Sequence, residues 1–571
     1  VTAYAVGKPE ASLYERQALR LLDAAEALRR SRLFFHWELE FPEVFFSPDG
    51  HALGERAGFD VVIGNPPYVR QEKLAEDKPF FQEHYAVYHG QADLFVYFFE
   101  QGLRLLRPGG RLAYISSNSW LRANYATALR HFLRTQMTVE ELIDLGNTRI
   151  FADAPDLSPA IQIVRKAPPT PDSQAQVAVF TRSEGIRDFA RRLEERRFAV
   201  TIGDQPDSGW QLRSDASRRL FGRLLAQGRP LKEVVAGRMY PGVLTGLNEA
   251  FIVDTATRER LLQADPDSAA LLKPLVRGED LRPWYQEDEG RWLIFARRGI
   301  DIEAYPAIKA HLEQFRERLE PRPADWDPHR PWPGRKPGSY RWYEIQDAID
   351  YYQEFETTKI FWPDFAKYPR FSWDERGLFV NNKGYIAPTN DISLLGILQS
   401  RVIWFCITHL CLPLAEREGL MIYQHFTQYI ERLPIPELSE EQRQRIGTLA
   451  RQLTEVARRR YSLRRRTTQR IIRDLGAGQQ KLSERLSEWW TLSFDVFREE
   501  LRRSFKRDIP LKERDDWEAL LSERRQEIEQ LTAEIVRLET ALNQAVYDLF
   551  ALDETERTLI DEETAYRYGE W

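Results

Sequence analysis

The chain has 571 residues, with 81 Lys and Arg against 87 Asp and Glu, a net charge of −6 and 43% hydrophobic residues. At about 100–200 residues per domain, this length predicts several domains, and the hydrophobic fraction excludes a wholly disordered chain. No apolar run reaches the roughly 18 residues that a membrane-spanning helix needs, and the acidic balance excludes a uniformly basic nucleic-acid coat. Two cysteines, Cys406 and Cys411, are too few for a disulfide scaffold, which fits a cytoplasmic location.

The first part of the chain alternates helical and strand patterns. Leu and Ala at helical spacing predict a helix over 10–30. FDVVIG at 59–64 predicts a buried strand that ends at the turn residues Asn65-Pro66-Pro67. Further helices are expected at 91–107 and 122–135, and further strands at 111–116, 139–146 and 160–166. Strands that alternate with helices indicate a mostly parallel, doubly wound α/β sheet.

Two changes of composition divide the rest of the chain. KAPPTPDSQAQ at 166–176 is rich in Pro and polar residues and predicts a linker. Short mixed segments with many Trp and Tyr follow, up to about 436. Beyond them, apolar residues at steps of three and four predict two helices packed antiparallel in a coiled-coil-like arrangement. The two seams are Ile446, Leu449, Leu453 and Val456, and Ile528, Leu531, Ile535, Leu538 and Leu542.

The sequence Asn65-Pro66-Pro67-Tyr68 at the end of the predicted strand is the most informative feature. An amino nitrogen conjugated with a ring is a poor nucleophile, and a site activates it by accepting hydrogen bonds from both of its N–H groups. Asn65 offers a side-chain carbonyl and Pro66 a backbone carbonyl, and neither proline has an N–H that competes. Two prolines hold these acceptors rigidly. Tyr68 offers a face on which a base can stack.

The same four residues also fit a plain surface turn, because Asn-Pro often begins one. For an isolated NPPY the turn is the better interpretation. Here the motif follows a strand pattern directly, and open α/β sheets bind their ligands at the carboxyl ends of strands. This context favours a catalytic role.

FDVVIGNPPYVRQ resembles the catalytic motif of S-adenosylmethionine-dependent adenine-N6 DNA methyltransferases. The preceding FHWELEFPEVFF resembles the segment found before that motif in the Eco57I-like and type IIG restriction–modification group. The blocks at 92–121 and 143–166 resemble the parts of the catalytic domain that follow the motif. The resemblance implies a Rossmann-like methyltransferase sheet that flips an adenine out of double-stranded DNA and methylates its N6 amine, with Asn65, Pro66, Pro67 and Tyr68 as the catalytic residues.

The resemblance also implies two further aromatic contacts. Phe151 matches the residue that touches the flipped adenine edge-on, beside Tyr68, and Phe98 matches the residue that lies against the cofactor's adenine, with Pro67 as a further cofactor contact. No metal is implied. Taken without the family, Phe98 and Phe151 are more simply interpreted as core residues.

The middle of the chain resembles the target-recognition domain of TaqI-like adenine methyltransferases, over PLKEVVAGRMYPGVLTGLNEAFIVD, 271–284 and 359–389. Basic and aromatic residues alternate in two of its segments, as in loops that contact phosphates. Nine arginines between 451 and 473 fit either a helix beside the DNA backbone or a solvated helix face. The candidate DNA contacts in the middle of the chain are Arg335, Lys336, Arg341, Lys359 and Arg370.

One part of the family pattern does not occur. The glycine-rich cofactor loop is expected well before NPPY, and only Gly7 and Gly50 precede Gly54 there. The sheet is therefore expected to be incomplete at its amino end, with the cofactor loop on a missing amino-terminal portion or on a partner. We expect the chain to be the carboxy-terminal part of a longer methyltransferase or one chain of a split one. A nuclease domain, if one exists, would lie on the missing part.

These observations predict four regions: a helical and connecting segment of the catalytic domain at 1–58, the catalytic domain with its linker at 59–175, a target-recognition domain at 176–436 and a helical region at 437–571. The predicted function is adenine-N6 DNA methylation in a restriction–modification or phage-defence system. Two alternatives remain open. The first is a non-catalytic DNA-specificity or partner subunit, and the second is methylation of an amine in RNA or protein.

Overall fold

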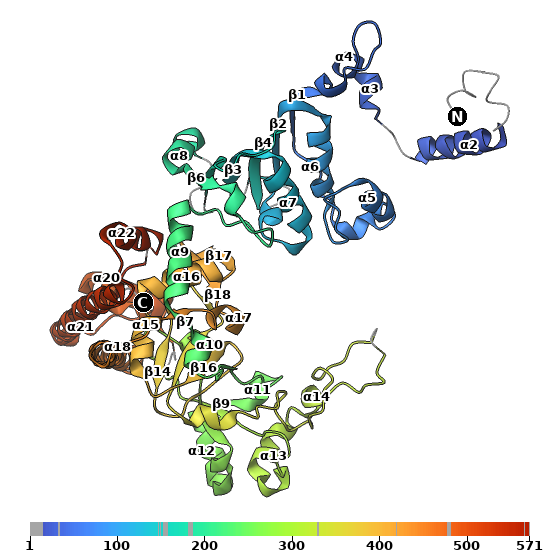
Figure 1. Cartoon of the computed structure of the whole chain (residues 1–571). Coiled ribbons are helices and arrows are strands. Elements are labelled where there is room, and N and C mark those ends of the chain that lie inside the picture. The colour runs from blue at the N-terminus through green and yellow to red at the C-terminus, as the bar shows by residue number, and fades with distance from the viewer. Residues whose placement is uncertain are drawn as a thin grey trace. The chain divides into compact units, whose positions relative to one another are not determined.

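The computed structural model describes residues 15–31, 35–146, 148, 150–151, 158–180, 187–327, 330–417, 419–476, 481–564 and 566–569. The chain divides into two compact units, Val1–Asp215 and Ala216–Trp571. In Figure 1 the first unit runs from blue to green and the second from green to red.

A six-stranded sheet with the strand order β1-β2-β4-β3-β5-β6 is the centre of the first unit (Figure 1). Its strands are β1 (Phe59–Gly64), β2 (Leu106–Ser117), β3 (Thr138–Asp144), β4 (Pro159–Arg165), β5 (Gln174–Val179) and β6 (Phe198–Thr201). The pairs β1–β2 and β3–β5 are parallel, whereas β2–β4, β3–β4 and β5–β6 are antiparallel. The prediction of a mostly parallel sheet is therefore wrong. Parallel neighbours need a long crossover, usually a helix, and the described residues between β3 and β4 contain no helix.

Helices cover the two faces of this sheet unequally. α6 (Leu94–Leu105) and α7 (Thr127–Gln136) pack on one face, in a core that includes Leu112 and Tyr114 from alternate positions of β2. α8 (Phe189–Arg196) packs on the other face against a smaller cluster around Phe180. The other α-helices among the described residues of the unit are α2 (Glu15–Ser31), α3 (Trp37–Glu40), α4 (Pro42–Phe45) and α5 (Lys78–His84).

β1 lies at the edge of the sheet and is not buried as predicted. Val62 pairs with Leu112 and packs against the α6–α7 core. Val61 and Ile63 alternate with it on the opposite face, where their side chains are 57% and 80% exposed. The described part of the chain thus leaves one apolar face of β1 uncovered.

The sheet continues beyond residue 175. β5 begins inside the predicted linker and crosses the predicted boundary at 176, β6 lies beyond that boundary, and residues 166–173 connect β4 to β5. At the end of the unit, Thr201 donates its backbone N–H (3.1 Å) and its hydroxyl (2.6 Å) to the carboxylate of Asp215.

The described residues of the second unit form four small sheets. One has the order β15-β10-β11-β9 and another β14-β12-β16-β8; β13-β18-β17 and β19-β7 complete them. The strands are β7 (Arg229–Pro230), β8 (Tyr240–Pro241), β9 (Ile252–Asp254), β10 (Leu272–Val276), β11 (Arg291–Ile294), β12 (Lys359–Pro363), β13 (Phe365–Ala366), β14 (Ser372–Asp374), β15 (Phe379–Val380), β16 (Gly384–Pro388), β17 (Pro413–Arg417), β18 (Leu420–Gln424) and β19 (Pro434–Ile435).

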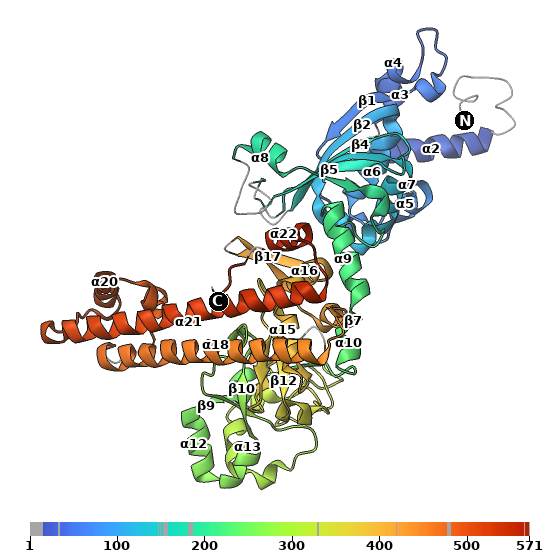
Figure 2. The ribbon, with the colours of Figure 1, turned by 60° about the vertical axis from the view of Figure 1, so that its left-hand side comes forward.

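Two helices of 36 residues each, α18 (Glu440–Leu475) and α21 (Arg514–Leu549), lie side by side in this unit (Figure 2). A capping box begins α18, since Ser439 and Gln442 each accept a hydrogen bond from the other's backbone N–H. The predicted seams are packed: the residues of the α21 seam are buried, and Leu449 and Val456 of the α18 seam are partly buried. An ion pair of 3.1 Å joins Arg459 to Glu527 across the two helices. Supercoiling of the pair stays a prediction.

The long helices α18 and α21 share a hydrophobic core with the small sheets, because one hydrophobic cluster contains residues of β12, β14, α15, α18 and α21. The Trp284 indole N–H donates to the Glu539 carboxylate at 2.9 Å. The other α-helices are α9 (Asp215–Gln227), α10 (Leu231–Val234), α11 (Asn248–Phe251), α12 (Thr255–Ala264), α13 (Pro306–Glu313), α14 (Arg316–Leu319), α15 (Ile392–Leu398), α16 (Arg401–Leu410), α17 (Thr427–Ile430), α19 (Glu484–Ser487), α20 (Phe494–Phe505) and α22 (Glu554–Glu563).

Within the described residues, no single helix has the length and apolar character needed to cross a membrane. The bent pair α15–α16, with an angle of 62°, passes that test by length and composition when its two helices are taken together.

Candidate functional site

The NPPY motif follows β1 without a gap, as the sequence predicts. Pro66 is buried, whereas Asn65 and Pro67 are exposed and Tyr68 is half-buried. The chain after the motif is fastened to the start of α6, because the carbonyl of Val69 accepts a hydrogen bond from the backbone N–H of Leu94 at 3.0 Å. The motif is therefore held at both ends while the Asn65 side chain stays accessible.

The structure brings Tyr68 and Phe151 together, although 82 residues separate them in the chain. Their ring centroids lie 6.3 Å apart, with the planes tilted by 58°. The Tyr68 hydroxyl donates to the carbonyl of Ile115 in β2 at 3.4 Å. Burial raises the pKa of this hydroxyl above its ordinary value, so it stays neutral and holds the ring in place. The pair offers two aromatic surfaces beside the motif. Residues 152–157, which follow Phe151, lie outside the described residues.

A polar network that the sequence did not single out lies at the same edge of the sheet, where β2 and β3 end. The carboxylate of Asp144, the last residue of β3, is buried and accepts from the Asn118 amide (2.8 Å) and the Gly146 backbone N–H (2.9 Å). The Arg122 guanidinium lies 3.7 Å from the same carboxylate. β2 and β3 run in the same direction on either side of β4, so polar residues at their carboxyl ends are a signal for such a network. It fastens the turn that leads from β3 toward Phe151.

The two candidate cofactor residues are less enclosed. Phe98 lies on α6 with 38% of its side chain exposed, and its backbone carbonyl accepts from the Tyr114 hydroxyl at 3.4 Å. Pro67 is exposed. Because β1 is an edge strand with an uncovered face, the described residues do not enclose a pocket around Phe98 and Pro67, and their contact with S-adenosylmethionine stays a prediction. Among the described residues, no group of three or more His, Cys, Asp or Glu side chains could hold a metal ion.

The five candidate DNA contacts lie in different environments. Arg335 is buried and donates to five backbone carbonyls, and burial lowers its pKa to about 10. Lys359 is fully buried and pairs with Asp374 at 2.7 Å. Arg370 donates to the carbonyls of Leu281 and Glu279. Lys336 and Arg341 are exposed. Only these last two present a free surface to a phosphate, and Arg335 and Lys359 instead hold the protein together.

Comparison with known proteins adds the family. Residues 8–151 match the model described as Eco57I restriction-modification methylase, and residues 273–435 match the TaqI-like C-terminal specificity domain. The chain carries an Eco57I-type methylase region and a TaqI-like specificity domain. The resemblance to the Eco57I-like group and to a TaqI-like recognition domain is thereby confirmed, and adenine-N6 specificity stays a prediction. Residues 439–546, which include α18 and most of α21, match a domain of unknown function, DUF8810.

Several curated relatives match about two thirds of the chain, and others match a shorter part. Type II methyltransferase M.XhoI of Xanthomonas vasicola is 26% identical over 398 residues, which are 66% of this chain and 68% of the relative. Type II methyltransferase M.BstVI of Geobacillus stearothermophilus is 27% identical, over 69% of this chain and 70% of the relative. The restriction enzyme and methyltransferase RM.Eco57I of Escherichia coli is 29% identical over 97 residues, which are 16% of this chain and 10% of that protein.

Two solved structures of restriction–modification enzymes are also similar. The type IIL enzyme MmeI in complex with DNA is 13% identical, over 89% of this chain and 57% of that chain, with a TM-score of 0.48. The type IIG restriction endonuclease BpuSI is 13% identical, over 86% of this chain and 54% of that chain, with a TM-score of 0.29. The chain thus spans a little more than half of each of these two proteins.

Proposed function

We propose that the chain carries the catalytic motif and the target-recognition domain of an adenine-N6 DNA methyltransferase of a type IIG-like restriction–modification or phage-defence system. The observation that carries the proposal is the NPPY motif at the carboxyl end of β1 with the Tyr68 and Phe151 rings beside it. The match to a restriction-modification methylase model over residues 8–151 and the type II methyltransferase relatives support it.

In this proposal the adenine leaves the duplex and lies against Tyr68, with Phe151 touching its edge. Stacking of roughly 1–3 kcal/mol offsets part of the few kcal/mol that base flipping costs. The Asn65 side-chain carbonyl and the Pro66 backbone carbonyl accept hydrogen bonds from the N6 amine and draw it toward tetrahedral geometry. No strong general base is needed, because the amine gains acidity as it is methylated.

S-adenosylmethionine is the methyl donor that this family membership implies, with Phe98 and Pro67 on one side of it. The described residues do not complete its site, and we propose that a further polypeptide segment, which carries the glycine-rich cofactor loop, covers β1. The apolar face of Val61 and Ile63 supports this, because exposed apolar patches on a strand favour association.

Double-stranded DNA is the proposed partner, and a cytoplasmic location goes with that substrate. The TaqI-like specificity domain at 273–435 supports DNA recognition by the second unit. Lys336 and Arg341 remain candidate phosphate contacts because both are exposed.

The test uses the purified chain, alone and together with any polypeptide encoded directly upstream. Each preparation is incubated with labelled S-adenosylmethionine and plasmid DNA, and the nucleosides are analysed. We expect labelled N6-methyladenine that disappears in Asn65→Ala and persists in Asn124→Ala, a control at an exposed asparagine of the same unit. Label in RNA or protein but not in DNA would refute the proposal.

A second candidate is a non-catalytic DNA-specificity subunit, which the open wall of the cofactor site favours. In that case the chain binds no cofactor by itself, and Asn65→Ala leaves DNA binding and any methylation by the assembled enzyme unchanged.

A further inference from the structure

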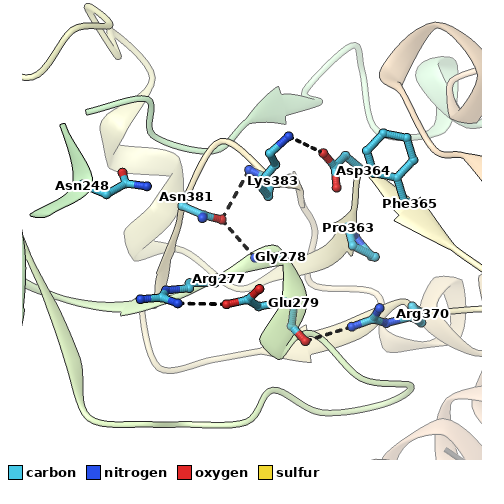
Figure 3. A pocket seen from close by; sticks show the side chains of 10 residues that line it. All are labelled: Asn248, Arg277, Gly278, Glu279, Pro363, Asp364, Phe365, Arg370, Asn381 and Lys383. Carbon is cyan, nitrogen blue, oxygen red and sulfur yellow. Dashed lines mark hydrogen bonds and ion pairs between the residues drawn. The ribbon is translucent and has the colours of Figure 1, made fainter. Parts of the chain in front are cut away.

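A cavity of about 530 Å³ opens in the second unit between two turns (Figure 3). The turn after β10 contributes Arg277 and Glu279, the turn before β16 contributes Lys383, and Asp364 comes from the end of β12. This volume lies in the range of sites that bind a group the size of a nucleotide, about 300–1,000 Å³. The function proposed above assigns no role to these four side chains.

The side chain of Asn381 forms hydrogen bonds with both turns. Its side-chain carbonyl accepts from the backbone N–H of Gly278 at 3.0 Å and from that of Lys383 at 3.3 Å (Figure 3). The turns approach so closely that a Cβ on Gly278 would lie 2.0 Å from the carbonyl oxygen of Lys383. The spacing between Arg277 and Lys383 is therefore fixed by the backbone.

A second side chain also stabilises the wall of the cavity by hydrogen bonds to the backbone. Arg370 donates to the carbonyls of Leu281 (2.8 Å) and Glu279 (3.1 Å) and so holds the first turn in shape. Burial lowers the pKa of Arg370 to about 10, which leaves it charged at neutral pH. Arg370 uses its guanidinium to hydrogen-bond backbone carbonyls. Arg277 and Lys383 are therefore the cations of this cavity that a ligand can reach, and 39% and 59% of their side chains are exposed.

Each of these cations faces a carboxylate. Arg277 pairs with Glu279 at 2.9 Å, and Lys383 pairs with Asp364 at 3.2 Å (Figure 3). Ion pairs at the surface contribute roughly 0–1 kcal/mol, so a ligand can replace them at little cost. A phosphate is a poor match because the two carboxylates repel it, whereas the edge of a base pair presents acceptors and donors next to each other.

We propose that this cavity reads a G·C pair of the bound DNA. The Arg277 guanidinium donates to O6 and N7 of the guanine, and the Glu279 carboxylate accepts from N4 of the paired cytosine; O6 and N4 lie side by side in the major groove, as the two side chains do here. Lys383 and Asp364 flank this contact, and Asn381 positions it. The inference rests on the proposed function in taking double-stranded DNA as the partner.

The experiment selects binding sites from a random library of double-stranded oligonucleotides with the full chain, together with its partner where one is required. We expect the selected sites to share a G·C pair. Discrimination at that pair should fall by about 5- to 150-fold in Arg277→Ala, while the other positions of the site stay unchanged. Replacing that guanine by 7-deazaguanine should weaken binding of the unmodified protein and have no further effect on Arg277→Ala.

Lys309→Ala is the matched control, because Lys309 forms a similar exposed pair with Glu303 at 2.7 Å outside the cavity. Its site preference should match that of the unmodified protein, and equal thermal unfolding of both variants excludes misfolding. A uniform loss of affinity in Arg277→Ala with a shallower salt dependence would identify a phosphate contact and overturn the proposal, as would unchanged discrimination.

The outcomes separate this inference from the proposed function. Selection of a G·C-containing site without N6-methyladenine supports the cavity and refutes methylation. Methylation without a G·C preference that depends on Arg277 refutes the cavity alone. Failure to bind any double-stranded DNA overturns both.

Discussion

Replacing Lys359 by Met should unfold the region around β12 and β14 more easily and leave DNA contacts untouched. The Lys359 ammonium is fully buried and donates to the carbonyls of Phe355 and Thr357 and to the carboxylate of Asp374. These bonds use all three of its N–H groups. Lys359→Met keeps the aliphatic stem and removes the charge, so the buried Asp374 carboxylate loses its nearest cation and keeps only the longer ion pair with Arg376, at 3.7 Å.

The size of the effect follows from what Asp374 retains. Removing one partner of a buried ion pair costs about 3–5 kcal/mol. Asp374 keeps hydrogen bonds from the backbone N–H groups of Leu378 (2.9 Å) and Arg376 (3.2 Å), which still stabilise its charge. We therefore expect the lower end of that range, about 3 kcal/mol. Hydrogen exchange of the β12 amides measures this loss as a lower free energy of opening.

The double variant Lys359→Met with Asp374→Asn is the control. It removes the uncompensated charge while the Asn oxygen can still accept from the backbone, so part of the lost stability should return. Exchange in Lys359→Met that matches the unmodified protein, together with weaker and less salt-dependent DNA binding, would refute the reasoning. That result would return Lys359 to the role of a phosphate contact.

Three further predictions concern other parts of the chain. Burial lowers the pKa of His425 to about 3, and neither ring nitrogen has a hydrogen-bond partner among the described residues. The unfolded chain takes up this proton below pH of about 6.5 and the folded chain does not, so stability should fall toward pH 3 by at most about 1.4 kcal/mol per unit. His425→Phe should flatten this slope, as urea midpoints at pH 7 and 5 will show. Gly278→Ala forces the two turns of the cavity apart and should cost about 1–3 kcal/mol in thermal unfolding, because a Cβ has no room there. Ile63→Lys should change the stability of the isolated chain by no more than about 0.5 kcal/mol, since the side chain is 80% exposed. The same variant should prevent completion of the proposed cofactor site. Binding of S-adenosylmethionine in the presence of the partner segment measures this loss.

Local periodicity located the elements of the first unit but not their pairing. The predicted strand at 59–64 has the bounds of β1, and the predicted strands near 139–146 and 160–166 became β3 and β4. An apolar pattern indicates which residues face a core, and it does not say which strand lies alongside or in which direction it runs. β4 lies between β2 and β3 and is antiparallel to both, whereas the sequence predicted mostly parallel strands.

The same limit applies to charge. A basic residue beside aromatic residues has the same sequence signature whether its acceptors are phosphates or carbonyls of its own chain. Arg335 donates to five backbone carbonyls, and Lys359 pairs with a buried carboxylate. Exposed Lys336 and Arg341 could not be separated from these two before the fold was known.

The sequence predicted that some residues far apart in the chain lie close together in the fold, and it did not predict this for others. Tyr68 and Phe151 were matched through the family resemblance, and their rings lie 6.3 Å apart. Arg277 and Lys383 lie in two segments that resemble the TaqI-like recognition domain, but that resemblance did not pair them with each other. Asn381 brings them together by accepting hydrogen bonds from two backbone N–H groups. No spacing of residues in the sequence predicts this interaction.

The exposed face of β1 links these observations to mechanism. A strand as apolar as FDVVIG is expected to be buried on both faces, and β1 has such cover only on the side of Val62. The uncovered face belongs to the strand that directly precedes Asn65, and Phe98, the candidate cofactor contact, is exposed in the same unit. A segment that covers Val61 and Ile63 would remove an aggregation-prone edge and supply the second wall of the cofactor site at once. The apolar character of β1 and the open side of the proposed cofactor site therefore have one physical explanation.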